Sequence, residues 1–271
     1  MSDLITDFFF DIGKTSNYKL SIQVCLDGFS FSVFSPEENK IVAFKNSARR
    51  ISNPHFIAQH FDEWIKSNEL LRKDFLEITI LFFTDEFALI PENFHSKSLI
   101  TETERIIARD DTPKSIQINT IKGLTTKTEI AFYFPSNLKK VIDIHFSNAL
   151  LCHSLQFVLP FLPQQKNKAN QVLVIYLKKS CLVVCSKRGE VLLANGITVG
   201  HENDLVYSVM NTLKQVGFAS SDTDFYLAEA AENQKWPEEL FRACLPEITY
   251  LQPRENASLV PQTIHRYFPT V

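Results

Sequence analysis

Acidic side chains are the first residues of this sequence whose types and spacing suggest chemistry. Asp27 follows an alternating apolar segment, Asp62 or Glu63 lies in a stretch of helical period, and Asp85 or Glu86 follows a continuous apolar run. Nucleases that hold two metal ions about 4 Å apart gather carboxylates from comparable places. Asp27, however, falls in a turn, beyond the strand centre where a metal ligand is needed. Acids of turns and helix surfaces are ordinarily solvated, and we predict no metal site here.

A second motif, near the start of the chain, has part of the pattern of a phosphate-binding loop: Asp11-Ile12-Gly13-Lys14-Thr15. A complete loop of this kind has a second glycine five residues before Gly13, and Phe8 occupies that position. No strand-to-helix pattern follows. We interpret the segment as a polar turn that leads into the first strand.

Cysteine and histidine offer no catalytic or metal-binding constellation. Cys181 and Cys185 point to one side of a predicted strand, but four residues of strand separate them by about 13 Å. His145 and His153 flank Cys152 without the spacing of zinc ligands. No Gly-x-Ser-x-Gly motif occurs. We therefore predict no catalytic residues and no bound metal.

The elements that must position the acids begin with a three-stranded unit. Leu20–Cys25 alternates between apolar and polar residues, Asp27-Gly28 marks a turn, and alternation resumes at Phe29. After a third strand, Asn53 caps a helix whose apolar face is formed by Ile57, Phe61, Trp64 and Ile65. A continuous apolar strand, Glu77–Phe83, completes the unit.

The same order of elements recurs about 150 residues later. The second unit consists of Val172–Tyr176, Cys181–Cys185, Glu190–Asn195, a helix over Glu202–Val216 and the strand Asp224–Glu229. Val206, Val209, Leu213 and Val216 form the predicted apolar face of that helix, and Gly217 ends it. Equivalent elements of the two units are 147 to 152 residues apart. This constant spacing predicts an internal duplication.

The duplication divides the chain into three predicted segments. Residues 1–98 form a first lobe, 99–165 an inserted α+β subdomain and linker, and 166–271 a second lobe. Within the insertion we expect strands at Ser115–Ile121 and Glu129–Phe134, and a helix capped by Ser136. The polar, proline-bounded stretch at 163–168 is typical of a linker between lobes.

Two βββαβ units in tandem resemble the duplicated ribonuclease H-like fold of the actin, Hsp70 and sugar-kinase superfamily. More narrowly, Tyr18-Lys19-Leu20-Ser21-Ile22 and Asp27-Gly28-Phe29-Ser30-Phe31 resemble an uncharacterised bacterial family with this actin-like fold. The resemblance covers most of the chain. It implies an α/β protein of two ribonuclease H-like lobes around a cleft, where active relatives bind ATP and a divalent metal. It also implies Asp27 and Gly28 as the remnant of a phosphate loop.

The sequence departs from the active members of that superfamily at both phosphate loops. Those members place an Asp-x-Gly hairpin loop in each lobe, whose backbone N–H groups and metal-linked carboxylate hold phosphates. Asp27-Gly28 lacks the spacing and the small residues that follow, and the second turn, Tyr176-Leu177-Lys178-Lys179-Ser180, has neither acid nor glycine. Bulky side chains keep backbone away from phosphate, and no Gly-Gly pair flanks an adenosine. We predict a degenerate nucleotide cleft and no cofactor.

Composition limits the remaining function classes. The 271 residues carry a net charge of −3, which argues against a nucleic-acid binder, and only 7 are glycine, which argues against a glycine-built phosphate cradle. An acidic N-terminus, no apolar window of spanning length and five cysteines without disulfide spacing predict a cytoplasmic protein.

These observations favour a non-catalytic scaffold or partner-binding module whose partner is another protein. Two alternatives remain open at this point. An ATP-binding phosphotransfer enzyme requires Asp27 beside the nucleotide, and a metal-dependent nuclease requires Asp27 and Asp85 at one metal site. The aromatic residues Phe29, Phe31 and Trp236 are expected in the core rather than at an interface.

Overall fold

The structure is a computed structural model. It describes residues 3–251 except 27, 48–50, 52, 95, 97–101, 104, 108–111, 125, 165–167, 177–179, 230–236, 243 and 246. Asp27, Lys178, Lys179 and Trp236 therefore lie outside the described residues. The helices and strands that lie within the described part of the chain, with 3₁₀ helices written η, are β1 (Ile5–Thr6), η1 (Ile12–Asn17), β2 (Lys19–Cys25), β3 (Gly28–Ser35), β4 (Lys40–Ser47), η2 (Pro54–Phe56), α1 (Ile57–Lys66), η3 (Glu69–Arg72), β5 (Glu77–Phe82), β6 (Phe87–Pro91), η4 (Glu92–Phe94), β7 (Lys114–Ile121), β8 (Thr128–Pro135), α3 (Ser136–His145), β9 (Leu150–His153), α4 (Leu155–Val158), η5 (Leu159–Gln164), β10 (Asn170–Tyr176), β11 (Ser180–Lys187), β12 (Glu190–Thr198), α5 (Glu202–Val216), η6 (Ser220–Asp222), β13 (Thr223–Glu229), α6 (Glu238–Arg242) and β14 (Thr249–Tyr250).

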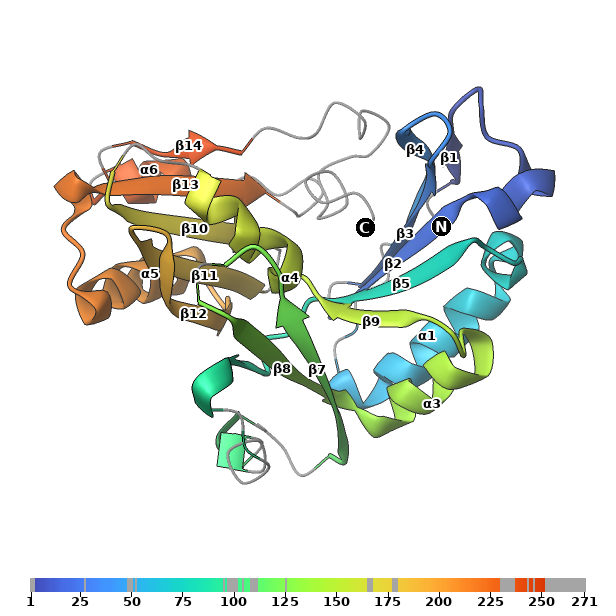
Figure 1. Ribbon diagram of the computed structural model, residues 1–271, viewed down its shortest axis with the longest axis horizontal. Helices are drawn as coiled ribbons and strands as arrows, with labels where there is room; N and C mark the ends of the chain where they lie inside the picture. The colour runs from blue at the N-terminus through green and yellow to red at the C-terminus, as the bar shows by residue number, and fades with distance from the viewer. Residues whose placement is uncertain are drawn as a thin grey trace.

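Two sheets share one strand order. The first runs β1-β4-β3-β2-β5-β9 and the second runs β12-β11-β10-β13-β14. In each sheet the first three strands of the unit are antiparallel, the strand after the helix pairs in parallel with the first strand, and the last strand adds in parallel. Figure 1 shows the two sheets at opposite ends of the molecule's long axis. The prediction of two tandem ribonuclease H-like βββαβ units is confirmed.

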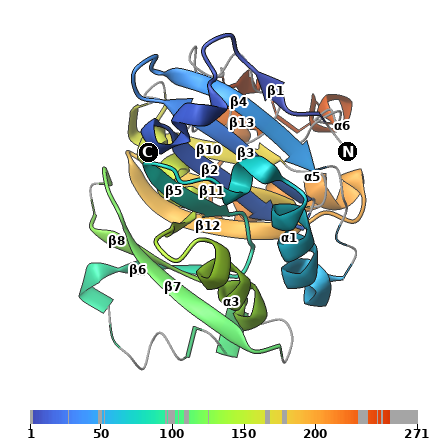
Figure 2. The same cartoon turned by 90° about the vertical axis from the view of Figure 1, so that its right-hand side faces the viewer.

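The segment between the two units forms a small sheet of its own and also adds a helix and a strand to the first lobe. β6, β8 and β7 form a separate three-stranded antiparallel sheet. α3 packs beside α1, as Figure 2 shows from the side of the first lobe. β9 returns to the first sheet next to β5 (Figure 1). Residues 136–153 thus contribute a helix and a strand to the first lobe's layers. The exact boundaries at 98 and 165 stay a prediction.

Local sequence explains how the helices of the two units begin and end. The Asn53 side chain accepts a hydrogen bond from the His55 N–H at 3.0 Å, and Pro54 follows it, as predicted. Gly217 ends α5 in the left-handed conformation, with φ 71°, also as predicted. The predicted cap at Ser136 is wrong. Ser136 is already the first residue of α3, and its hydroxyl receives a hydrogen bond from Ser115 of β7.

Two large hydrophobic clusters stabilise the described part of the molecule, beside a small third cluster of Ile41 and Phe44. The smaller of the two large clusters lies between one face of the second sheet and α5, where Leu205, Val209 and Leu213 are buried, while the predicted Val206 is only partly buried. The larger contains α1, the first sheet and the opposite face of the second sheet, and is therefore continuous between the lobes. Phe29 and Phe31 belong to it, as predicted.

Candidate functional site

A cavity of about 350 Å³ lies between the lobes. It opens where the parallel strands β2 and β5 end, near Cys25 and Phe82, and the start of β11 and the end of β12 close it from the second lobe. The carboxyl ends of parallel strands are where open α/β sheets bind ligands. Its lining residues are Val24, Cys25, Leu26, Ile51, Pro54, Ile57, Phe82, Phe83, Thr84, Asp85, Glu86, Lys114, Tyr133, Phe134, Pro135, Leu138, Ser180 and Thr198.

The first-lobe turn at this cavity is short. Cys25 and Gly28 are paired across β2 and β3, so only residues 26 and 27 connect the strands. Gly28 has φ 129°, a backbone conformation that favours glycine. The Cys25 thiol donates a hydrogen bond to the Gly28 carbonyl at 3.4 Å. The turn therefore presents Leu26 to the cavity. The predicted role of Asp27 and Gly28 in cofactor binding stays a prediction, because Asp27 is not among the described residues.

The second lobe contacts the loop after β5 directly. The Thr198 hydroxyl donates a hydrogen bond to the Asp85 carboxylate at 3.1 Å. Two residues earlier on β12, Gly196 lies so close that a Cβ atom there would come within 2.5 Å of the Asp85 Cα. The backbone of β12 thus packs directly against the backbone of Asp85. Position 196 requires glycine because a side chain there would collide with Asp85.

Glu86, the next residue, is neutralised by a lysine from the three-stranded sheet. The Lys114 Nζ lies 3.1 Å from Glu86 Oε1 and 3.0 Å from Oε2, and the two side chains are only 6% and 12% exposed. The Glu86 carbonyl also accepts a hydrogen bond from the Tyr133 N–H at 2.9 Å. One acid of the loop is therefore held by Thr198 and the other by Lys114.

A buried histidine forms a hydrogen bond with the backbone of the loop after β5. His153, at the end of β9, is fully buried, and its Nε2 lies 3.0 Å from the Thr84 carbonyl oxygen. Its Nδ1 accepts a hydrogen bond from the Leu155 N–H at 3.2 Å, so Nε2 carries the proton of a neutral imidazole. Desolvation lowers the pKa of His153 to about 4. The uncharged ring packs against Phe87 and Phe132.

The acids considered for a nuclease site are not brought together. Asp85 and Glu86 line the cavity, whereas Asp62 and Glu63 do not. Asp62 instead lies 2.6 Å from the Lys66 ammonium and 2.7 Å from His145 Nε2, joining α1 to α3. Hydrogen bonds from Lys66 and His145 lower the pKa of Asp62. Within the described residues no group of three or more His, Cys, Asp or Glu could hold a metal ion.

The cysteines predicted to be buried lie in hydrophobic surroundings. Cys181 and Cys185 are buried in the cluster between the second sheet and α5. Burial raises the pKa of the Cys185 thiol to about 12 and that of the partly exposed Cys152 to about 11. These groups are protonated at neutral pH and are poor nucleophiles.

Four polar residues of the cavity were not singled out by the sequence reasoning: Thr84, Lys114, Tyr133 and Thr198. Ser180 was named only as the end of the second-lobe turn. Ser180 and Thr198 are paired at the ends of β11 and β12, so the repeat placed their strands but not their contact with the first lobe. Lys114 and Tyr133 come from strands of the insertion. No local pattern distinguishes them from other residues of amphipathic strands.

None of the helices in the described part of the chain is long and apolar enough to cross a membrane. The fold is similar to that of solved structures. One is a Bacteroides thetaiotaomicron protein described as having an actin-like ATPase fold and unknown function. It is 16% identical, with a TM-score of 0.81, over 90% of this chain and 94% of that chain. Another is described as the PilM–PilN type IV pilus biogenesis complex. It is 11% identical, with a TM-score of 0.54, over 88% of this chain and 89% of that chain.

These likenesses show the actin-like ATPase fold that the tandem units predicted. No curated protein sequence matches this chain. Residues 7–245, which include both βββαβ units and the strands and helices between them, match the family described as Protein of unknown function (DUF3822). The resemblance to an uncharacterised family is thereby confirmed, and the chain belongs to the DUF3822 family.

Proposed function

We propose that this protein is a non-catalytic member of the actin-like fold that works in the cytoplasm as a scaffold or partner-binding module. The observation that supports this proposal most directly is the close packing of β12 against the loop after β5. Gly196 approaches the Asp85 backbone, and Thr198 engages the Asp85 carboxylate. A direct contact between the two lobes therefore lies beside the cavity, and it supports a cleft that does not close around phosphates.

The chemistry of the cavity also supports a non-catalytic role. The Glu86 carboxylate is compensated by Lys114, so it offers little charge to a divalent cation. The volume of about 350 Å³ is near the lower end of small-molecule sites. Apolar side chains such as Leu26, Phe82 and Phe83 line the wall next to the first-lobe turn.

A protein partner is supported by one of the structural neighbours. The structure with a TM-score of 0.54 is described as a complex of PilM with PilN, which shows that this fold can serve in a complex with a second protein. The acidic net charge of −3 supports a protein rather than a nucleic acid as the partner.

The decisive experiment titrates the purified full chain with ATP and Mg²⁺ and follows thermal unfolding. A ligand present at a thousand times its dissociation constant would stabilise the folded state by about 4 kcal/mol. We expect no shift of the midpoint and no phosphate release. Binding with a micromolar dissociation constant would overturn the proposal. Loss of such binding in Asp27→Asn would then support the phosphotransfer alternative, and unchanged binding would exclude Asp27 from it.

A further inference from the structure

A turn at the outer edge of the first sheet presents two aromatic side chains to solvent. The Phe10 N–H donates a hydrogen bond to the Asp7 carbonyl at 3.1 Å, which closes a turn with Phe8 and Phe9 at its tip. The Phe8 side chain is 95% exposed and Phe9 is 49% exposed. A phenylalanine exposed to this degree contributes almost no burial to the stability of its own chain.

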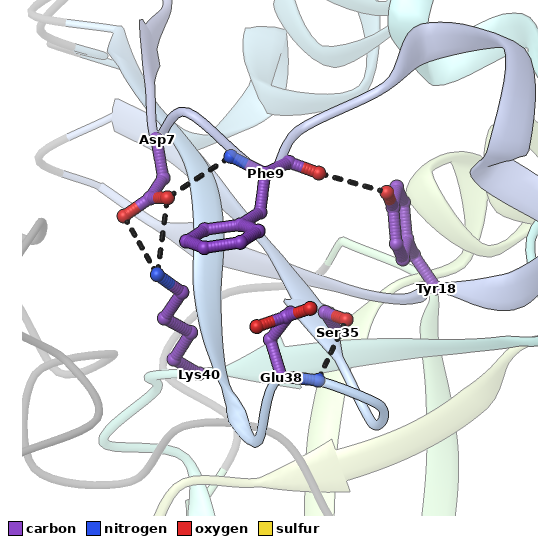
Figure 3. A network of polar contacts seen from close by, with 6 residues as sticks. All are labelled: Asp7, Phe9, Tyr18, Ser35, Glu38 and Lys40. Carbon is purple, nitrogen blue, oxygen red and sulfur yellow. Dashed lines mark hydrogen bonds and ion pairs between the residues drawn. The ribbon is translucent and has the colours of Figure 1, made fainter.

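The turn is held in place by a network of polar contacts (Figure 3). The Asp7 carboxylate accepts a hydrogen bond from the Phe9 N–H at 3.1 Å and receives the Lys40 ammonium at 3.1 Å. The Tyr18 hydroxyl donates to the Phe9 carbonyl at 3.2 Å, and the Lys40 ammonium lies 4.1 Å from the centre of the Phe9 ring. The hydrogen bonds from the Phe9 N–H and the Lys40 ammonium lower the pKa of the Asp7 carboxyl, so the network is intact at neutral pH. Phe8 is therefore displayed on an ordered support.

The residues next to this turn add further exposed apolar side chains to the same surface. β1 pairs with β4, and the Asp7 N–H donates to the Val42 carbonyl at 2.8 Å. This strand is the outer edge of the first sheet, at the end of the molecule remote from the second sheet (Figure 1). The exposed large apolar residues of this region, here called the N-terminal aromatic patch, are Leu4, Ile5, Phe8, Phe9 and Ile12.

Charge around the patch indicates the kind of partner that fits. The two segments that form its surroundings, residues 3–14 and 35–40, contain five acids and two lysines, and one of each is used in the Asp7–Lys40 pair. Figure 3 places Glu38 on the β3–β4 turn, near the same pair. A second copy of this chain would bring an equally acidic rim against this one, and like charges oppose such pairing.

We propose that the N-terminal aromatic patch is a docking surface on which Phe8 inserts into an apolar pocket of a partner protein whose pocket is rimmed by lysine and arginine. This inference rests on the proposed partner-binding function and assigns the residues that perform it. An aromatic residue whose backbone is already held in place before binding loses less entropy when its side chain is buried, which is typical of an interface anchor.

The first step of the test places the photo-crosslinker p-benzoylphenylalanine at position 8 of the full chain in its native cells. The matched control places it at position 94, because Phe94 is also largely exposed, at 67%, but lies on η4 in another part of the molecule. We expect a crosslinked protein at position 8 that is absent at position 94. No crosslink at position 8, a crosslink to a second copy, or a crosslink to lipid alone would overturn the proposal.

The second step measures affinity between the purified chain and the crosslinked protein. We expect Phe8→Ala to weaken binding at least about tenfold and Phe94→Ala to leave it unchanged. Replacing Glu37 and Glu38 by Gln should reduce the dependence of binding on salt. Unchanged affinity in Phe8→Ala, with an unchanged unfolding midpoint, would refute the anchor. This result says nothing of ATP, so it is distinguishable from failure of the proposed function.

Discussion

At the scale of single residues, His153 connects the candidate site to the pH of the solution. Its neutral ring accepts the Leu155 N–H and donates to the Thr84 carbonyl, one residue before Asp85. Protonation would place a charge among Phe87 and Phe132 and remove the acceptor at Nδ1. The folded conformation of the loop after β5 therefore depends on an uncharged His153.

This dependence predicts how stability changes with pH. The pKa of His153 is about 4 in the folded protein, below the usual value of 6.5, so between these values the unfolded chain binds a proton that the folded chain does not. The stabilisation is present above pH 6.5 and is lost as the pH falls towards 4. We expect the free energy of unfolding, measured by urea titration, to decrease by about 2 kcal/mol more between pH 7 and 5 in the wild type than in His153→Gln. Equal decreases in both proteins would contradict this assignment.

The Lys114–Glu86 pair makes a second prediction at this scale. Because both side chains are almost buried, removing one partner leaves an uncompensated charge. We expect Lys114→Met to cost about 3 kcal/mol of unfolding free energy, and the double variant Lys114→Met with Glu86→Leu to recover part of that loss.

The control for the Lys114–Glu86 pair is the exposed ion pair between Lys73 and Glu69 on the surface of the first lobe. Lys73→Met should change the unfolding free energy by less than about 1 kcal/mol. Similar losses in Lys114→Met and Lys73→Met, measured by the same urea titration, would show that Lys114 does not compensate a buried charge.

At the scale of elements, the contact between β12 and the loop after β5 makes a prediction that glycine substitutions can test. A methyl group on Gly196 would collide with the Asp85 backbone. We expect Gly196→Ala to cost about 1–3 kcal/mol of unfolding free energy through overpacking. Gly200→Ala is the matched control, because a Cβ there meets no backbone atom and only the Asp204 Oδ2 atom, at 3.2 Å. Equal stability of the two variants would refute the close seating of the lobes.

Elements were also the level at which sequence reasoning was most informative. The structure confirms three kinds of local signal: the apolar strands at Leu20–Cys25 and Val172–Tyr176, the cap at Asn53, and the end of α5 at Gly217. β1, β6 and β9 were not predicted. β1 has only two residues, and all three strands are defined by partners distant in sequence. Ser136 has the residue type of a cap, but its bond to Ser115 of β7 determines its place.

The candidate site was less predictable than the fold because its residues come from three separate sheets. Asp85 could be singled out because it follows a predicted buried strand. No local pattern indicates, however, that Thr198 donates a hydrogen bond to it. Lys114 belongs to a strand whose residues are mostly half-buried and which contains no catalytic motif. Contacts of this kind depend on how the sheets pack against each other, which sequence periodicity does not specify.

At the scale of the whole molecule, two copies of one strand order enclose a cavity at the same edge of each sheet. The fold is similar to that of the Bacteroides thetaiotaomicron structure described as having an actin-like ATPase fold. Here the cavity is bridged by Thr198 and Asp85, while the aromatic patch lies at the far edge of the first sheet. Under the proposed function, the edge of the first lobe rather than the space between the lobes is the surface that binds.

The continuous hydrophobic cluster has a mechanical consequence. Leu173 and Leu182, on the second sheet, belong to the same cluster as α1 and the first sheet. A hinge motion that swung the lobes apart would wet these side chains, at a cost of about 25 cal/mol for each Å² of apolar surface exposed. We therefore expect the two lobes to move as one rigid body, so that the N-terminal aromatic patch keeps a constant orientation relative to the second lobe.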